Sequence, residues 1–328
     1  MKKVLNIVSV GLLSLSLASC SLNGVENITE QSTADFPATA DDAESVLAGI
    51  YQNLNQMNQY PQESFLYYSF LASDDQLGGG GPNDKLMQAE DMLCNYGANM
   101  TNDFWTVRYR GINSANTLIQ ALPNTKLTDA QKNQYMGEAL FLRAFYYYEL
   151  ASMYGNVPLI TVPTGTLVQQ GKVTVLWGQI IQDFRDAADL LPAVSTHNNG
   201  HVDKYCAEAM LARAWLFYTG MYGDGTELKD LTSTVYKPLT SVALPDGKTL
   251  TKQDVCKYID DCVNNSGYSL VPDYRNLWAY TNRCTVNDYP YTKGKGLKWC
   301  QDDENEKHNA DDVENMFAIK FNTIIIIG

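Results

Sequence analysis

The residues with the clearest chemical potential are aromatic side chains in an irregular stretch towards the end of the chain. A sugar ring has apolar C–H faces, on which Trp and Tyr rings can stack while polar side chains bind the hydroxyl groups. The spacing of these rings follows no helical three-and-four pattern, which favours exposed positions for at least two of them. The alternative is that each ring packs over neighbouring helices. The candidate sugar contacts are Trp278, Tyr280, Tyr289, Tyr291 and Trp299.

A glycine-rich stretch follows the acidic pair Asp74 and Asp75. Residues 78–81 are all glycine, but no Gly-Lys-Ser or Gly-Lys-Thr follows them, so the stretch is not a phosphate-binding loop. The acidic residues around it do not have the spacing of an EF-hand calcium loop. We therefore expect a surface loop here.

The sequence contains no pattern typical of an active site. His197, His201 and His308 lie in polar, irregular stretches, away from any HExxH motif or nucleophile elbow. The first two lie in a Gly/Asn-rich turn with no nearby carboxylate or Cys ligand, so we expect solvated side chains and no metal site. Carboxylate pairs such as Asp260 and Asp261 are common on surfaces. We predict a protein that is not an enzyme and needs no cofactor.

The cysteines show no zinc-binding spacing. An exported protein can form disulfides, and a Cys284–Cys300 bond would close the aromatic stretch, but the sequence fixes no pairing. Cys256 and Cys262 lie six apart on one predicted helix and point to different sides, so they are poor partners. Six cysteines follow Cys20: Cys94, Cys206, Cys256, Cys262, Cys284 and Cys300.

The N-terminus has the form of a bacterial lipoprotein signal. Met1-Lys2-Lys3 precedes an apolar run over residues 4–17 that is short for a membrane span. The run ends in Leu-Ala-Ser-Cys at residues 17–20, a lipobox in which the cysteine becomes the lipidated first residue. The alternative is ordinary secretion with a chance cysteine. We predict a signal peptide over 1–19, lipidation of Cys20 and a polar tether over 20–40.

Two similar helices organise the predicted fold. Glu-Ala-Leu-Phe-Leu-Arg-Ala-Phe at residues 138–145 is echoed 70 positions later by Glu-Ala-Met-Leu-Ala-Arg-Ala-Trp at residues 208–215. This offset is about two periods of a tetratricopeptide repeat, a helix–turn–helix unit of about 34 residues. The alternative is a coincidence between two Ala-rich helices in an unrelated bundle.

The first of these helices is apolar on two faces and must be sandwiched between neighbours. We expect helices over 138–154 and 204–221 with a third, over 173–191, packed between them. Further helices are predicted from residue 41, over 104–122 and over 251–265, with Thr128 as an N-cap. The predicted fold is mainly α: a tetratricopeptide-like helical repeat superhelix with irregular, loop-rich segments and little β.

Composition limits the possible partners. A chain of 328 residues with 45% hydrophobic residues can bury a sizeable core. Its net charge of −13 argues against nucleic acid, whose binding proteins carry basic patches.

Residues 142–150, Leu-Arg-Ala-Phe-Tyr-Tyr-Tyr-Glu-Leu, followed by Tyr-Gly-Asn-Val-Pro-Leu at 154–159, closely resemble the SusD/RagB family of Bacteroidetes outer-membrane lipoproteins. The resemblance covers essentially the whole chain after Cys20, although Gly-His-Val at 200–202 departs from the Gly-Arg-Val-like sequence common in the family. Other matches follow in order: Gly-Ile-Tyr at 49–51, Ser-Asp-Asp at 73–75, Ile-Asn-Ser-Ala-Asn at 112–116, and Leu-Leu-Pro at 190–192.

The resemblance implies a lipid-anchored, cell-surface protein of the outer membrane. Such proteins capture oligo- or polysaccharide for import through a TonB-dependent SusC-like porin, and Asp74 and Asp75 match a region that contributes to the ligand face. A segment like residues 314–322 begins the second half of the family fold, so we expect residues 41–328 to be its N-terminal part, with the C-terminal half missing. The competing hypothesis is a tetratricopeptide-type scaffold lipoprotein without glycan binding.

Overall fold

The computed structural model describes residues 36–37, 39–55, 65–73, 101–193, 200–222 and 238–270, and the single positions 290, 293 and 316. The chain divides into two units, Met1–Phe36 and Pro37–Gly328. All the elements below belong to the second unit. Among the described residues, no helix is long and apolar enough to cross a membrane.

The described part of the chain is mainly helical, as predicted. A short hairpin pairs two antiparallel strands, with Val242 opposite Leu250. In chain order the elements are α2 (Ala40–Asn55), α3 (Phe65–Leu71), α5 (Asn102–Ala121), the 3-10 turn η4 (Leu122–Asn124), α6 (Asp129–Tyr154), α7 (Val173–Leu190), α8 (Lys204–Met221), β1 (Ser241–Ala243), β2 (Thr249–Thr251) and α9 (Lys252–Asn265).

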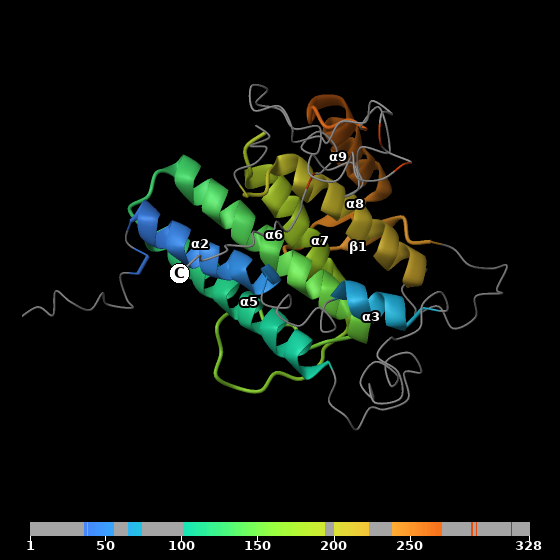
Figure 1. Cartoon of the computed structure of the whole chain (residues 1–328), viewed down its shortest axis with the longest axis horizontal. Coiled ribbons are helices and arrows are strands. Elements are labelled where there is room, and N and C mark those ends of the chain that lie inside the picture. Colours follow the sequence, from blue (N-terminus) through green and yellow to red (C-terminus); the bar gives the residue numbers. More distant parts are fainter. Residues whose placement is uncertain are drawn as a thin grey trace, which may run out of the picture. The chain divides into compact units, whose positions relative to one another are not determined.

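Helices that follow one another in the chain pack side by side. From α5 onwards each long helix contacts the next, and α2 packs against both α5 and α6 (Figure 1). The structure therefore confirms that α7 packs between α6 and α8, the two helices that carry the repeated sequence. This succession of antiparallel neighbours is the arrangement of a helical repeat.

Helix α6 is the central member of this stack. Thr128 caps its N-terminus in a capping box with Gln131, as the sequence predicts, and Gly155 ends it with a positive φ of 72°. Tyr146 and Tyr147 are fully buried in its second half. Gly111 of α5 makes room for Tyr146, because a Cβ at that glycine would lie 2.5 Å from the tyrosine ring. Helix α5 can therefore approach α6 closely at this point.

The β1–β2 hairpin packs on the first turns of α7. Its turn contains Gly247 at a φ of 83°, a backbone conformation that favours glycine. A Cβ at Gly178 of α7 would lie 2.8 Å from the carbonyl oxygen of Ala243, so the glycine permits this contact. Directly after the hairpin, Thr251 and Asp254 form a capping box that starts α9. The hairpin therefore sets where α9 begins.

We predict that Leu142→Asp unfolds the protein or lowers its stability by on the order of 4 kcal/mol, because it places an unpaired charge in the core. Leu142 is fully buried. Leu216 of α8 is 69% exposed, so Leu216→Asp should change stability by no more than about 0.5 kcal/mol. Urea denaturation followed by circular dichroism measures both. Equal midpoints for Leu142→Asp and the unsubstituted chain would contradict the fold.

Candidate functional site

The candidate binding and lipidation residues lie outside the described part of the chain. Helix α3 ends at Leu71, shortly before the acidic pair, and α9 ends at Asn265, shortly before the aromatic stretch. Each candidate segment therefore follows a described helix in the sequence: the acidic pair follows α3, and the aromatic stretch follows α9. The residues that stay predictions are Cys20, Asp74, Asp75, Trp278, Tyr280, Tyr289, Tyr291 and Trp299.

A buried ion pair joins α6 to α7. Arg143 donates to both carboxylate oxygens of Asp183, from Nε at 2.7 Å and from Nη2 at 2.8 Å. Its Nη1 donates to Asn116 Oδ1 on α5 at 2.9 Å and to the carbonyl oxygen of Thr161 at 3.3 Å. Gln179 donates a further hydrogen bond to Asp183 at 2.7 Å. Arg143 therefore ties three helices and a loop to one point in the core.

The same cluster fixes the first part of the long loop between α6 and α7, residues 155–172. The hydroxyl of Tyr147 both donates to the carbonyl of Ile160 at 3.0 Å and accepts from its N–H at 2.7 Å. Asn116 donates to that carbonyl at 2.9 Å, and Tyr109 donates to the carbonyl of Pro158 at 2.7 Å. Side chains of α5 and α6 thus satisfy backbone groups that no secondary structure pairs.

The base of this loop is closed by two amide side chains. Asn156 donates to the carbonyl of Gly171 and Gln170 donates to the carbonyl of Asn156, both at 2.6 Å. Between these points residues 162–167 are exposed, Leu167 to 98%. The loop is therefore held at both ends and presents an uncharged tip.

A second buried ion pair lies beneath the C-terminal end of α2. Arg108 Nε on α5 is 2.5 Å from Glu149 Oε2 on α6, and Arg108 Nη1 donates to the carbonyl of Asn53 at 2.8 Å. The guanidinium also lies over the rings of Phe104 and Tyr146. Burial raises the pKa of Glu149, and the positive charge of Arg108 opposes that rise. This cluster joins α2 to the α5–α6 pair.

The prediction of a solvated His201 is wrong. Its Nδ1 lies 2.8 Å from Glu138 Oε2, and its Nε2 lies 3.3 Å from Glu44 Oε1. These carboxylates come from α6 and α2. Because both are far from His201 in the sequence, an inspection of the residues that flank the histidine cannot identify them. The hydrogen bond to Glu138 raises the pKa of His201, and burial opposes this rise.

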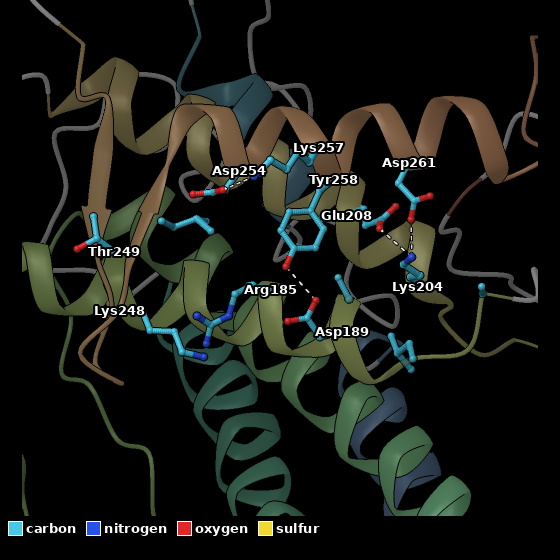
Figure 2. Close-up of a pocket in the computed structure, with 14 residues that line it drawn as sticks. Arg185, Asp189, Lys204, Glu208, Lys248, Thr249, Asp254, Lys257, Tyr258 and Asp261 are labelled. Carbon is cyan, nitrogen blue, oxygen red and sulfur yellow. Dashed lines mark hydrogen bonds and ion pairs between the residues drawn. The ribbon is translucent and has the colours of Figure 1, made fainter.

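A polar cleft of about 730 Å³ lies between α7 and α9, and residues of α8 and of the β1–β2 hairpin also line it (Figure 2). Tyr258 on α9 points across the cleft and donates a hydrogen bond to Asp189 on α7 at 2.9 Å. The cations that line it are paired with acids: Arg185 with Asp246, Lys204 with Asp261, and Lys257 with Asp254. The cleft therefore offers hydroxyl, carboxylate and amine groups to a polar ligand.

Glu208 lies beside Lys204 in this cleft (Figure 2). Its side chain is 1% exposed, Lys204 Nζ lies 3.5 Å from Oε1, and neither carboxylate oxygen makes a hydrogen bond with a described residue. Burial raises its pKa to about 7, and Lys204 opposes the rise. Within the described ranges no cluster of His, Cys, Asp and Glu side chains could hold a metal ion.

The comparison with family models matches residues 25–218 to the SusD-like model described as "Starch-binding associating with outer membrane". The chain belongs to the SusD-like family. SusD-like protein P38 of Formosa agariphila is 32% identical over 171 residues, which are 49% of this chain and 32% of that protein. SusD-like protein P2 of the same organism is 22% identical over 269 residues, 81% of this chain and 48% of that protein.

Solved structures show the same fold. A laminarin-binding SusD-like protein superposes with a TM-score of 0.57 at 23% identity, over 75% of this chain and 49% of that chain. A SusD homologue from Bacteroides thetaiotaomicron gives a TM-score of 0.55 at 20% identity, over 78% of this chain and 46% of that one. This SusD-like chain thus spans about half the length, or less, of the proteins it matches.

The charged clusters of this SusD-like chain were not assigned from the sequence. A signal was present for one of them: Arg143 lies within an α6 sequence that is apolar on two faces, and such a buried charge needs a partner. The helix expected beside it offers three acids, Asp183, Asp186 and Asp189, so the sequence does not single out Asp183. For Glu208 and the cleft no local signal existed, because α7, β2 and α9 meet there only in the fold.

We predict that Arg143→Met lowers stability by about 3–5 kcal/mol, because it leaves the carboxylate of Asp183 buried without its cation. Arg143→Met combined with Asp183→Leu should recover much of this loss, since both charges are then removed. Lys257→Met, which removes an exposed ion pair with Asp254, is the control and should cost less than about 1 kcal/mol. Urea denaturation measures all three. A double variant as unstable as Arg143→Met would show that charge pairing is not the cause.

Proposed function

We propose that this protein is a carbohydrate-binding lipoprotein of the cell surface. In this proposal it captures oligo- or polysaccharide and delivers it to a TonB-dependent SusC-like porin in the outer membrane. The observation that carries the proposal is the match of residues 25–218 to a family described as starch-binding and associated with the outer membrane. The likeness in fold to a laminarin-binding SusD-like protein supports the same class of ligand.

The proposed sugar contacts are the aromatic residues between 278 and 299, with Asp74 and Asp75 as hydrogen-bond acceptors. Apolar sugar faces and aromatic rings suit each other, and carboxylates accept hydrogen bonds from sugar hydroxyls. The two buried ion pairs of the described helices are internal, because Arg143, Asp183, Arg108 and Glu149 are all buried. Ligand binding is therefore assigned to the segments that the helices carry, rather than to the helical core.

The polar cleft between α7 and α9 is the competing location. It contains one aromatic side chain, Tyr258, whose hydroxyl is engaged by Asp189. It also suits the scaffold hypothesis, because tetratricopeptide stacks bind peptides in grooves between helices. A test of the proposed function must therefore separate the aromatic stretch from this cleft.

We predict that Trp278→Ala and Tyr280→Ala each weaken retention on a polysaccharide affinity gel, with laminarin and starch as first ligands. By analogy with base stacking, one lost ring contact costs on the order of 1–3 kcal/mol. The melting temperature and circular dichroism spectrum should stay nearly unchanged. Tyr258→Ala in the cleft is the matched aromatic control and should keep full retention.

Three outcomes would contradict this placement. Loss of retention with Tyr258→Ala alone would move the sugar to the cleft. Lost stability with unaltered retention would assign Trp278 and Tyr280 to the core. A chain that binds no polysaccharide but retains a peptide ligand would favour the scaffold function.

We also predict that Cys20 carries the lipid anchor. Cys20→Ala removes the thiol that a lipid would modify, so the protein should leave the membrane fraction or accumulate with its leader uncut. Cys256→Ala is the control, because this exposed cysteine lies on α9 and should not affect anchoring. Fractionation after a carbonate wash, followed by immunoblotting, measures both. Retention of the Cys20→Ala protein in the washed outer membrane would contradict lipidation at this residue.

A further inference from the structure

His201 lies between two carboxylates that belong to different helices. Its Nδ1 is 2.8 Å and 3.1 Å from the two carboxylate oxygens of Glu138 on α6. On the other side of the ring, Nε2 is 3.3 Å from Glu44 Oε1 on α2. The residue itself belongs to the segment that leads into α8. One imidazole therefore connects three parts of the chain.

The Glu138 side of this contact does not depend on a charged histidine. Glu138 is fully buried, and its carboxylate also accepts hydrogen bonds from Tyr51 Oη at 2.6 Å and Gln134 Nε2 at 3.2 Å. Tyr51 in turn accepts from the N–H of Val202 at 3.0 Å. Since carboxylate oxygens only accept, a neutral His201 keeps its proton on Nδ1 and still donates to Glu138.

The Glu44 side does depend on the charge. With the proton on Nδ1, the neutral ring presents the lone pair of Nε2 to an oxygen of Glu44, and two acceptors then face each other. When the ring is protonated, Nε2–H donates to Glu44 and the positive charge attracts both carboxylates. Glu44 has an exposed side chain, so this contact forms and breaks without opening the core.

The described tyrosines and the lysine near the ring keep their protons through neutral pH. Tyr51 on α2 lies edge-on to the imidazole, and burial raises its pKa well above the usual value. Tyr135 on α6 faces Glu44, Glu138 and Asp41, and burial and these acids raise its pKa as well. Lys204, three residues further along, is engaged by Asp261 and Glu208. Within this described cluster, His201 is thus the group whose unperturbed pKa lies between about pH 5 and pH 8.

We propose that His201 is a pH-dependent clasp that fastens α2 to the segment leading into α8. The protonated ring binds Glu44 and Glu138 together, whereas the neutral ring binds Glu138 alone. Release of Glu44 removes one of the contacts that hold α2, the first helix that the structure describes, while the α6–α7–α8 contacts remain.

The sign of the effect follows from the charge. Glu138 raises the pKa of His201 above its ordinary value of about 6.5, so the folded protein holds this proton more tightly than the unfolded chain. The stabilisation is fully present below about pH 6.5 and is lost as the pH rises through the folded-state pKa. The clasp is closed in mildly acidic and open in mildly alkaline conditions.

The clasp is tested by NMR titration of the His201 ring and by hydrogen exchange of the α2 amides, corrected for intrinsic exchange. In the unsubstituted protein the ring should titrate above about pH 6.5, and α2 protection should fall several-fold between about pH 5.5 and pH 8.5. Glu44→Gln removes the negative charge while keeping the size of the side chain. It should lower the pKa of His201 and flatten the α2 profile.

Two further variants complete the test. His201→Arg supplies a permanent cation and should keep α2 protected across the whole range. Asp260→Asn removes an exposed carboxylate from α9 and should leave the unsubstituted profile unchanged. A His201 pKa at or below about 6.5, or the same α2 profile in Glu44→Gln as in the unsubstituted protein, would overturn the proposal.

Discussion

The bidentate ion pair between Arg143 and Asp183 constrains most of the described structure. Both side chains are almost fully buried, and removing two charges from water costs several kcal/mol for each ion. That cost is offset only when the remaining donors and lone pairs also find partners. Here Asn116 of α5, Gln179 of α7 and the carbonyl of Thr161 supply them. Three helices and one loop must therefore reach their positions together, which fixes their register more sharply than apolar packing alone.

The internal repeat shows that this constraint is local. Arg213 occupies the position in α8 that Arg143 occupies in α6, yet Arg213 is exposed. Likewise Glu138 accepts hydrogen bonds from Tyr51 and Gln134, whereas the matching Glu208 lies beside Lys204 and Asp261 of the polar cleft. The repeated sequence thus encodes two similar helices, and the neighbours α2 and α5 decide which copy uses its charges to join elements.

Much of the helical fold could be predicted from the sequence because its signals are local. The Thr128 cap, the apolar faces of α6 and the stop at Gly155 all lie within or beside one helix. His201 could not be assigned, because its partners come from α2 and α6. The hairpin after α8 has strands of only three residues, and such strands are too short to show a recognisable alternation of apolar and polar residues. The aromatic candidates were selected because their spacing follows no helical period. The lack of a period does not specify how these rings are arranged around a ligand.

The charged contacts that join α2, α5, α6 and α7 to their neighbours are of two kinds, and these respond differently to pH. Arginine keeps its charge at any pH at which a protein is folded. The guanidinium groups of Arg143 and Arg108 are therefore positively charged over this whole pH range. The α5–α6–α7 association, and with it the loop over residues 155–172, rests on such pairs. The contact between α2 and the segment leading into α8 combines the Val202–Tyr51 hydrogen bond with the Glu44–His201 contact, and only the second of these depends on an imidazole. A proton can therefore change how α2 is held without disturbing the helices that carry the loops.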